Sequence, residues 1–136
     1  MPRGGVKRSF VYYYGCRYGD EKEVFWQNAD IFVFPTFYHN ECFPLVLLEA
    51  MQYGVACIST DEGGISDIIE DGTTGFIVER QNALQLAEKI GRFFDNPLWI
   101  SSFGDAASKK FKQEFTQTAF ENRMRNILTQ IIDYYA

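Results

Sequence analysis

The stretch Asn40–Gly54, which reads NECFPLVLLEAMQYG, decides how this chain of 136 residues folds. Glu41 precedes a segment that is mostly apolar, and Glu49 lies inside that segment. Pro44 suits the start of a helix, because its ring presets the backbone and its missing N–H is not needed there. Gly54 is a typical residue just after a last helical turn. The pattern therefore predicts a helix that opens at residue 43 or 44 and ends at Gly54.

Short apolar runs on either side of this helix predict a parallel sheet. These runs are apolar on both faces, which is typical of fully buried strands. They alternate with helical segments, as the strands of βαβ units do. The expected strands are Phe10–Tyr14, Ile31–Phe34, Val55–Thr60 and Gly75–Val78. The expected helices are Glu21–Ala29, Ser66–Glu70, Ala83–Phe94 after an Asn82 cap, a segment to about Glu114, and one from Thr116 to Tyr134. Four strands are few for a doubly wound domain, which leaves room for an incomplete sheet.

The bulk composition excludes several classes of protein. Apolar residues make up 46% of the chain and aromatic residues 17%, which argues against disorder. The net charge of −5 argues against a broad nucleic-acid surface, which needs clustered Lys and Arg. The three cysteines, Cys16, Cys42 and Cys57, fit no zinc spacing and predict free thiols in a reducing cytoplasm. No stretch approaches the ~20 apolar residues of a membrane span.

The two glutamates fall where an open parallel sheet binds ligands, at the carboxyl ends of its strands. Glu41 follows the strand Ile31–Phe34, and the next helix points its N-terminus at the same edge. The free N–H groups there, roughly those of Phe43, Leu45 and Val46, form an anion site without any basic side chain. Glu49 lies about 7 Å further along the helix axis.

Carboxylates are poor neighbours for phosphate but good acceptors for hydroxyl groups. A carboxylate on each side of an anion site therefore indicates a phosphate compound with hydroxyls at both ends, the shape of a nucleotide sugar. The alternative is that Glu41 is a solvated loop residue and Glu49 an acid stabilised by the helix dipole. The spacing alone does not separate these two interpretations.

A family resemblance favours the first interpretation. Residues Ala29–Val78 read ADIFVFPTFYHNECFPLVLLEAMQYGVACISTDEGGISDIIEDGTTGFIV. In order and spacing, the blocks A-D-strand-Pro, E-x-F-P-x4-E-A-M-x-x-G, G-G-hydrophobic and D-G-x-x-G resemble the C-terminal donor-binding domain of retaining GT-B glycosyltransferases of the family 4 type, or glycosyl transferases group 1. The resemblance covers roughly Phe10–Phe94. It implies an α/β fold with a Rossmann-like parallel sheet flanked by helices and C-terminal helices, the C-terminal half of a GT-B fold.

The resemblance also implies roles for individual residues. Glu41 would be catalytic, accepting hydrogen bonds from the donor sugar, and Glu49 would hold the ribose. Backbone of Phe43, Pro44 and Leu45 would lie against sugar and diphosphate, with Val46 near the phosphates and Gly15 and Cys16 near the base. No metal or other cofactor is expected. Cys42 departs from the family, which usually has glycine there.

The implied domain organisation follows the same resemblance. Residues 1–9 are expected to be a tail, residues 10–95 a partial Rossmann-like nucleotide-sugar-binding domain, and residues 96–136 a C-terminal helical tail. In the family, the acceptor domain and the phosphate-binding Arg and Lys lie upstream of the region that this chain matches. The resemblance leaves open a peripheral membrane association of the longer protein.

The expected activity is that of a glycosyltransferase of the hexosyltransferase type. The longer protein would transfer a sugar from a nucleoside-diphosphate sugar to an acceptor hydroxyl with retention, and this chain alone would be inactive. The alternative is a non-catalytic nucleotide-sugar-binding or interaction module that works with a partner chain. A response-regulator receiver domain fits poorly, because Gly15, Cys16 and Arg17 stand where that fold needs a phosphorylatable aspartate.

Overall fold

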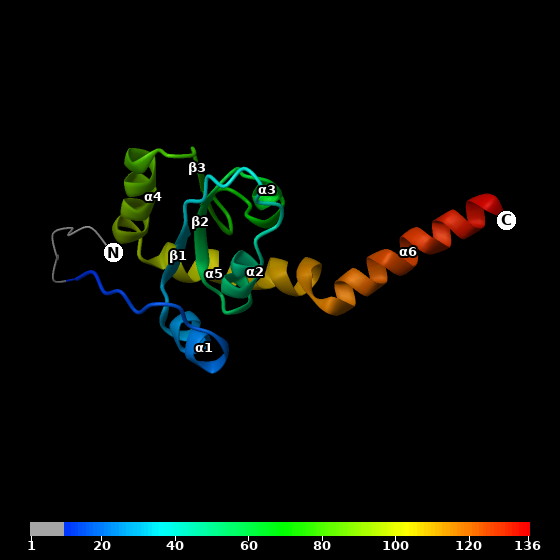
Figure 1. Ribbon diagram of the computed structural model, residues 1–136, viewed down its shortest axis with the longest axis horizontal. Coiled ribbons are helices and arrows are strands. Elements are labelled where there is room, and N and C mark those ends of the chain that lie inside the picture. Colours follow the sequence, from blue (N-terminus) through cyan, green and yellow to red (C-terminus); the bar gives the residue numbers. More distant parts are fainter. Residues whose placement is uncertain (1–9) are drawn as a thin grey trace.

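The computed structural model describes residues 10–136. Its centre is a parallel sheet of three strands in the order β1-β2-β3 (Figure 1). The strands are β1 (Ile31–Phe34), β2 (Ala56–Thr60) and β3 (Gly75–Val78). The helices are α1 (Gly19–Asn28), α2 (Leu45–Gln52), α3 (Ile65–Ile68), α4 (Ala83–Asp95), α5 (Leu98–Lys110) and α6 (Gln117–Tyr135), and a π-helix, η1 (Phe111–Phe115), joins the last two. The predicted α/β class and three of the four predicted strands are confirmed.

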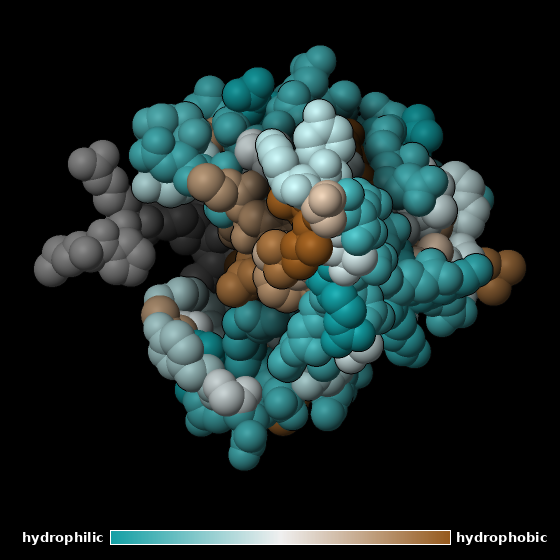
Figure 2. Space-filling model, turned by 90° about the vertical axis from the view of Figure 1, so that its right-hand side faces the viewer, coloured by the Kyte–Doolittle hydropathy of each residue, from teal (hydrophilic) through white to brown (hydrophobic). Residues whose placement is uncertain are grey.

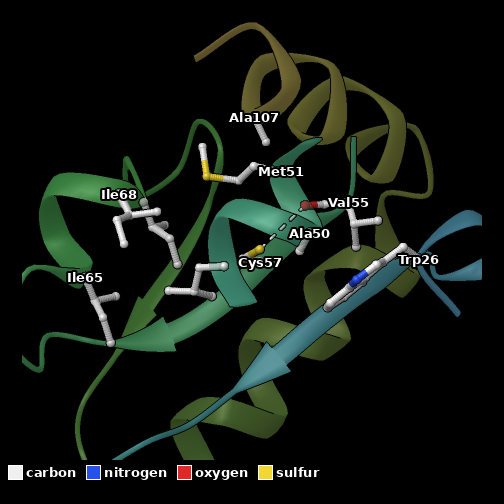
Figure 3. Close-up of a cluster of buried hydrophobic side chains, with 10 residues drawn as sticks. Trp26, Ala50, Met51, Val55, Cys57, Ile65, Ile68 and Ala107 are labelled. Atoms are coloured by element: carbon white, nitrogen blue, oxygen red, sulfur yellow. Dashed lines mark hydrogen bonds between the residues drawn. The ribbon is translucent and has the colours of Figure 1, made fainter. Parts of the chain in front are cut away.

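Two apolar clusters cover the two faces of the sheet. On one face, Cys57 of β2 packs with Met51 of α2, Ile68 of α3 and Ala107 of α5 (Figure 3). On the other face, Ala56 and Ile58 of β2 belong to a cluster with Phe76, Phe93 and Phe103 from β3, α4 and α5. Every residue of β2 is buried, as a central parallel strand should be. Helix α5 contributes to both clusters and so closes one end of the sheet.

Helix boundaries follow the capping chemistry of the sequence. The Asn82 side chain accepts from the Gln85 amide at 2.9 Å and starts α4, and the Thr116 hydroxyl accepts from the Ala119 amide at 3.2 Å and starts α6. Side chains of this kind satisfy N–H groups that have no partner inside the helix. At α2 the boundary differs from the prediction by a residue: Pro44 has ψ 110°, lies outside the helix and leaves Leu45 as its first residue.

The segment Phe10–Tyr14 was predicted to be a buried strand, and this prediction is wrong. The segment forms no strand, and its side chains are exposed, Tyr13 by 93%. An apolar run shows that a segment can be buried, but a strand also needs a hydrogen-bonding neighbour. Among the described residues the sheet contains only β1, β2 and β3, so neither of its edge strands is paired with this segment.

The C-terminal part also departs from expectation. The helix predicted to reach about Glu114 ends at Lys110, and the wider turns of η1 follow. This turn lets Phe111 and Phe115 both pack against the cluster that contains Met51. Helix α6 then projects away from the sheet (Figure 1) and has no buried residue. No helix among residues 10–136 is both long and apolar enough to cross a membrane.

Candidate functional site

The carboxyl end of β1 is fixed by two hydroxyl groups of β2. The Ser59 hydroxyl donates to the Phe34 carbonyl and the Thr60 hydroxyl to the Thr36 carbonyl, both at 2.6 Å. Both donors are completely buried, so these bonds form away from competing water. They hold the start of the loop that leads to Glu41.

The Gly63-Gly64 turn, after β2, holds the other end of that loop. The Gly64 amide donates to the Cys42 carbonyl at 2.7 Å. Gly63 has φ +51°, and a Cβ atom built there would lie 2.0 Å from the Glu41 carbonyl oxygen. Only glycine allows this approach and this conformation. The half-buried Glu41 is therefore placed at the carboxyl edge of the sheet, as predicted.

The N-terminus of α2 opens at the same edge. The Leu47 amide bonds the Pro44 carbonyl at 3.1 Å. The amides of Phe43, Leu45 and Val46 have no backbone acceptor among residues 10–136. Free amides at a helix start, together with the helix dipole, attract an anion. The sequence-predicted anion site is thus geometrically open.

Glu49 lies toward the other end of α2 and contacts α1. The Trp26 indole N–H donates to its Oε2 at 3.3 Å, and Lys22 Nζ pairs with the same oxygen at 2.5 Å. A hollow of about 370 Å³ opens beside these groups. Its lining residues are Tyr18, Gly19, Lys22, Glu23, Trp26, Glu49, Gln52 and Tyr53. Sequence analysis missed the two donors from α1, because no local pattern links positions 23 or more residues apart.

Gly15 and Cys16 lie in the exposed segment before α1. Gly15 has φ +69° and, with Arg17, lines a second hollow of about 780 Å³ beside Lys22 and Trp26. These two α1 residues therefore form a wall shared by both hollows. The structure brings Gly15 close to the surroundings of Glu49, whereas Glu41 lies at the opposite end of α2, against the Gly63 turn.

Arg80 is a cation at the carboxyl edge that sequence analysis did not single out. Its guanidinium pairs with Asp61 at 3.2 Å and with the buried Glu62 at 3.1 Å. Its charge is thus balanced within the chain. Among the described residues, no three His, Cys, Asp or Glu side chains are grouped closely enough to hold a metal ion.

Comparison with known proteins identifies the class to which this fold and this loop-helix arrangement correspond. The model of the family "Glycosyl transferases group 1" matches residues 8–117, so the chain belongs to this family. The expected recognition as a C-terminal GT-B region is thereby confirmed.

Individual relatives are enzymes of sugar transfer by name. The capsular polysaccharide biosynthesis glycosyltransferase CapM of Staphylococcus aureus is 35% identical over 92 residues, covering 68% of this chain and 24% of that protein. The putative colanic acid biosynthesis glycosyltransferase WcaL of Salmonella typhimurium is 28% identical over 123 residues, covering 86% of this chain and 30% of that protein. The chain thus spans less than a third of each of these relatives.

Solved structures show the same fold. Sucrose-phosphate synthase from Thermosynechococcus elongatus matches with a TM-score of 0.70 and 29% identity, over 82% of this chain and 27% of that one. Anabaena HepE in complex with UDP matches with a TM-score of 0.74 and 19% identity, over 82% of this chain and 30% of that one. At this low identity the second likeness concerns the fold alone.

Proposed function

We propose that this chain is the donor-binding part of a glycosyltransferase. The longer protein would transfer a sugar from a nucleoside-diphosphate sugar to an acceptor hydroxyl, with retention. The observation that carries the proposal is the open N-terminus of α2, placed between Glu41 and Glu49 at the carboxyl edge of a parallel sheet. In a chain of this family, such a site suits a diphosphate with a sugar on either side.

The diphosphate would lie at the start of α2. The amides of Phe43, Leu45 and Val46 are free to donate to its oxygens, and Pro44 keeps the backbone turned so that the helix starts there. Donors fixed before the reaction stabilise charge on a leaving group at little reorganisation cost. The roles proposed for these four residues follow from this position.

Glu41 would contact the transferred sugar and would be the catalytic carboxylate of the chain. Its peptide is held by the Gly63-Gly64 turn, so its side chain starts from a fixed point. Accurate positioning of a reacting sugar is a large part of the rate enhancement that an enzyme can supply. Cys42, next to it, would lie beside the same sugar.

Glu49 would accept the ribose hydroxyls, and the base would lie against Gly15 and Cys16. The two hollows that share Lys22 and Trp26 support this arrangement, because one touches Glu49 and the other touches Gly15. UDP and UDP-glucose are suitable probes, since solved structures of the same fold contain them.

We infer that the chain alone does not catalyse transfer. Near the candidate site, Arg80 is paired with two carboxylates and Lys22 with Glu49, so their charges are already balanced. A departing diphosphate needs additional positive charge, which the longer protein would supply. The same observation supports the second candidate function, a nucleotide-sugar-binding module without catalysis that works with a partner chain.

Calorimetric titration of the chain with UDP-glucose tests the proposed function. We expect saturable binding, and Glu49→Gln should weaken it roughly 10-fold or more, because a hydrogen bond to a charged group is lost. Glu121→Gln, on the exposed α6, is the control and should bind as the unaltered chain does. Equal affinity of Glu49→Gln and the unaltered chain would contradict the ribose role, and absence of binding would contradict the proposal as a whole.

A further inference from the structure

We infer that Trp26 and Lys22 of α1 are positioning residues for the ribose subsite: they bind Glu49 through one carboxylate oxygen and leave the other for a ligand. This inference rests on the proposed function, because it concerns the subsite that Glu49 would form. Neither residue lies in Ala29–Val78, the stretch that carries the named sequence blocks.

The contacts fall on a single oxygen atom. Trp26 Nε1 lies 3.3 Å and Lys22 Nζ 2.5 Å from Oε2 of Glu49. Among the described residues, no donor contacts Oε1. A carboxylate can accept about four hydrogen bonds over its two oxygens. Oε1 therefore keeps its accepting capacity for a hydroxyl group from outside the chain.

Trp26 is a rigid donor because the core fixes its ring. The residue is only 8% exposed, and its ring packs edge-on against Phe32 of β1 with ring centroids 4.9 Å apart. Figure 3 shows the ring lying beside β1 in the apolar cluster. A donor on a buried ring has few alternative rotamers. The hydrogen bond from this fixed ring therefore limits the rotation of the Glu49 carboxylate.

Lys22 lies one helical turn before Trp26, so both residues face α2 from the same side of α1. Its ammonium group balances the charge of Glu49. The side chains of Lys22 and Glu49 are 34% and 39% exposed, so water screens the pair and its contribution to stability is small. Its effect on binding is more direct, because an unbalanced carboxylate would repel a nearby diphosphate.

The space beside Glu49 suits a small polar ligand. The hollow there has a volume of about 370 Å³, within the range of roughly 300–1,000 Å³ found for small-molecule sites. Lys22 and Trp26 also line the neighbouring hollow with Gly15. A ligand that spans both hollows would therefore pass directly over the two positioning residues.

The test compares UDP with 2′,3′-dideoxy-UDP, which lacks the ribose hydroxyls, by calorimetric titration. The unaltered chain should bind UDP roughly 10-fold or more tightly than the dideoxy compound. Trp26→Phe keeps a buried aromatic ring but removes the N–H. We expect it to lower this ratio below about 3-fold, with little change in affinity for the dideoxy compound.

Trp99→Phe is the matched control, because Trp99 packs in the cluster on the opposite face of the sheet. It should keep the full ratio. Lys22→Gln should weaken UDP binding several-fold, while Lys22→Arg, which keeps the charge, should restore most of it. Circular dichroism of each variant shows whether it is folded, and the ratio of two ligands cancels any loss of folded protein.

The outcomes separate the inference from the proposed function. A chain that discriminates between the two nucleotides, but whose Trp26→Phe variant discriminates equally well, overturns the positioning role and leaves the proposed function standing. Equal affinity of Lys22→Gln and the unaltered chain for UDP overturns the part assigned to Lys22. An unaltered chain that does not discriminate, or does not bind, overturns the proposed ribose subsite and with it this inference.

Discussion

At Gly63, one missing methyl group decides where Glu41 can lie. The turn has a positive φ, and the Glu41 carbonyl occupies the space that a Cβ atom would need. The sequence shows a Gly-Gly pair after a strand, and this pair alone is explained equally well by a simple turn. Only the structure shows its contact with the loop of Glu41, because that contact joins the loops that follow two different strands, β1 and β2.

We predict that Gly63→Ala destabilises the chain more than Gly72→Ala does. Both glycines have positive φ, but nothing lies within 4 Å of a Cβ atom at Gly72. The backbone conformation alone costs about 1 kcal/mol or more, and Gly63→Ala adds a steric clash with the backbone. Urea denaturation should show a free energy of unfolding lower by a further ~1–3 kcal/mol for Gly63→Ala. Equal losses would mean that the loop of Glu41 moves away without cost.

A second residue-scale prediction concerns Cys42, which is exposed and adjacent to Glu41. If the donor sugar lies beside Glu41, UDP-glucose should slow alkylation of Cys42 several-fold more than UDP does, because only the former carries the sugar. Cys57 is buried, and burial raises the pKa of its thiol to about 12, so it should remain unmodified throughout. Mass spectrometry after iodoacetamide treatment measures both sites. Equal protection by the two ligands would place the sugar elsewhere.

Among the elements, those governed by local chemistry could be predicted from sequence. The caps at Asn82 and Thr116 fix the starts of α4 and α6 within a few neighbouring residues. The strand expected at Phe10–Tyr14 did not form, because strand formation depends on a neighbouring strand that local sequence does not specify. The π-helix η1 was also missed, since its wider turns serve the packing of Phe111 and Phe115.

For the candidate site, too, only the part that belongs to one local motif could be predicted from the sequence. Glu41, Glu49 and the α2 N-terminus belong to one continuous motif and could be proposed from sequence. The contact of Glu49 with Trp26 could not, because it joins a helix that precedes β1 in the chain to one that follows it.

Helix α5 should contribute far more to stability than α6, because only α5 has buried residues. Phe103 of α5 is 8% exposed and contacts three other aromatic rings. Phe120 of α6 is 58% exposed. We predict that Phe103→Ala lowers the free energy of unfolding by about 3–5 kcal/mol, and that Phe120→Ala changes it by less than about 0.5 kcal/mol. Thermal or urea unfolding tests this pair, and similar losses would show that α6 packs against the sheet.

At the scale of the whole molecule, two surfaces remain apolar and uncovered within the described residues. One is the exposed segment Phe10–Tyr14. The other is a face of α6 that carries Met124, Ile127 and Ile131. Figure 2 views the molecule from the side toward which α6 projects and shows hydrophobic side chains near the centre of the view. Exposed apolar surfaces and open strand edges favour association.

We therefore predict concentration-dependent self-association of the isolated chain. Replacing Val11 and Tyr13 by Lys should reduce it if the exposed segment Phe10–Tyr14 is the main contact, because charge interrupts an exposed apolar surface. Replacing Ile127 and Ile131 by Lys is the matched change on α6. Analytical ultracentrifugation of the three proteins measures the effect. A strictly monomeric unaltered chain at about millimolar concentration would contradict the prediction.

Whether a nucleotide sugar binds along α2 can be tested by following the ¹H–¹⁵N NMR spectrum of the chain during titration with UDP-glucose. We predict shifts at the amides of Phe43, Leu45 and Val46 and at the indole N–H of Trp26, while the indole N–H of Trp99 stays unchanged. Shifts confined to α4, α5 or α6, or a spectrum that does not change, would contradict the proposal that a nucleotide sugar binds along α2.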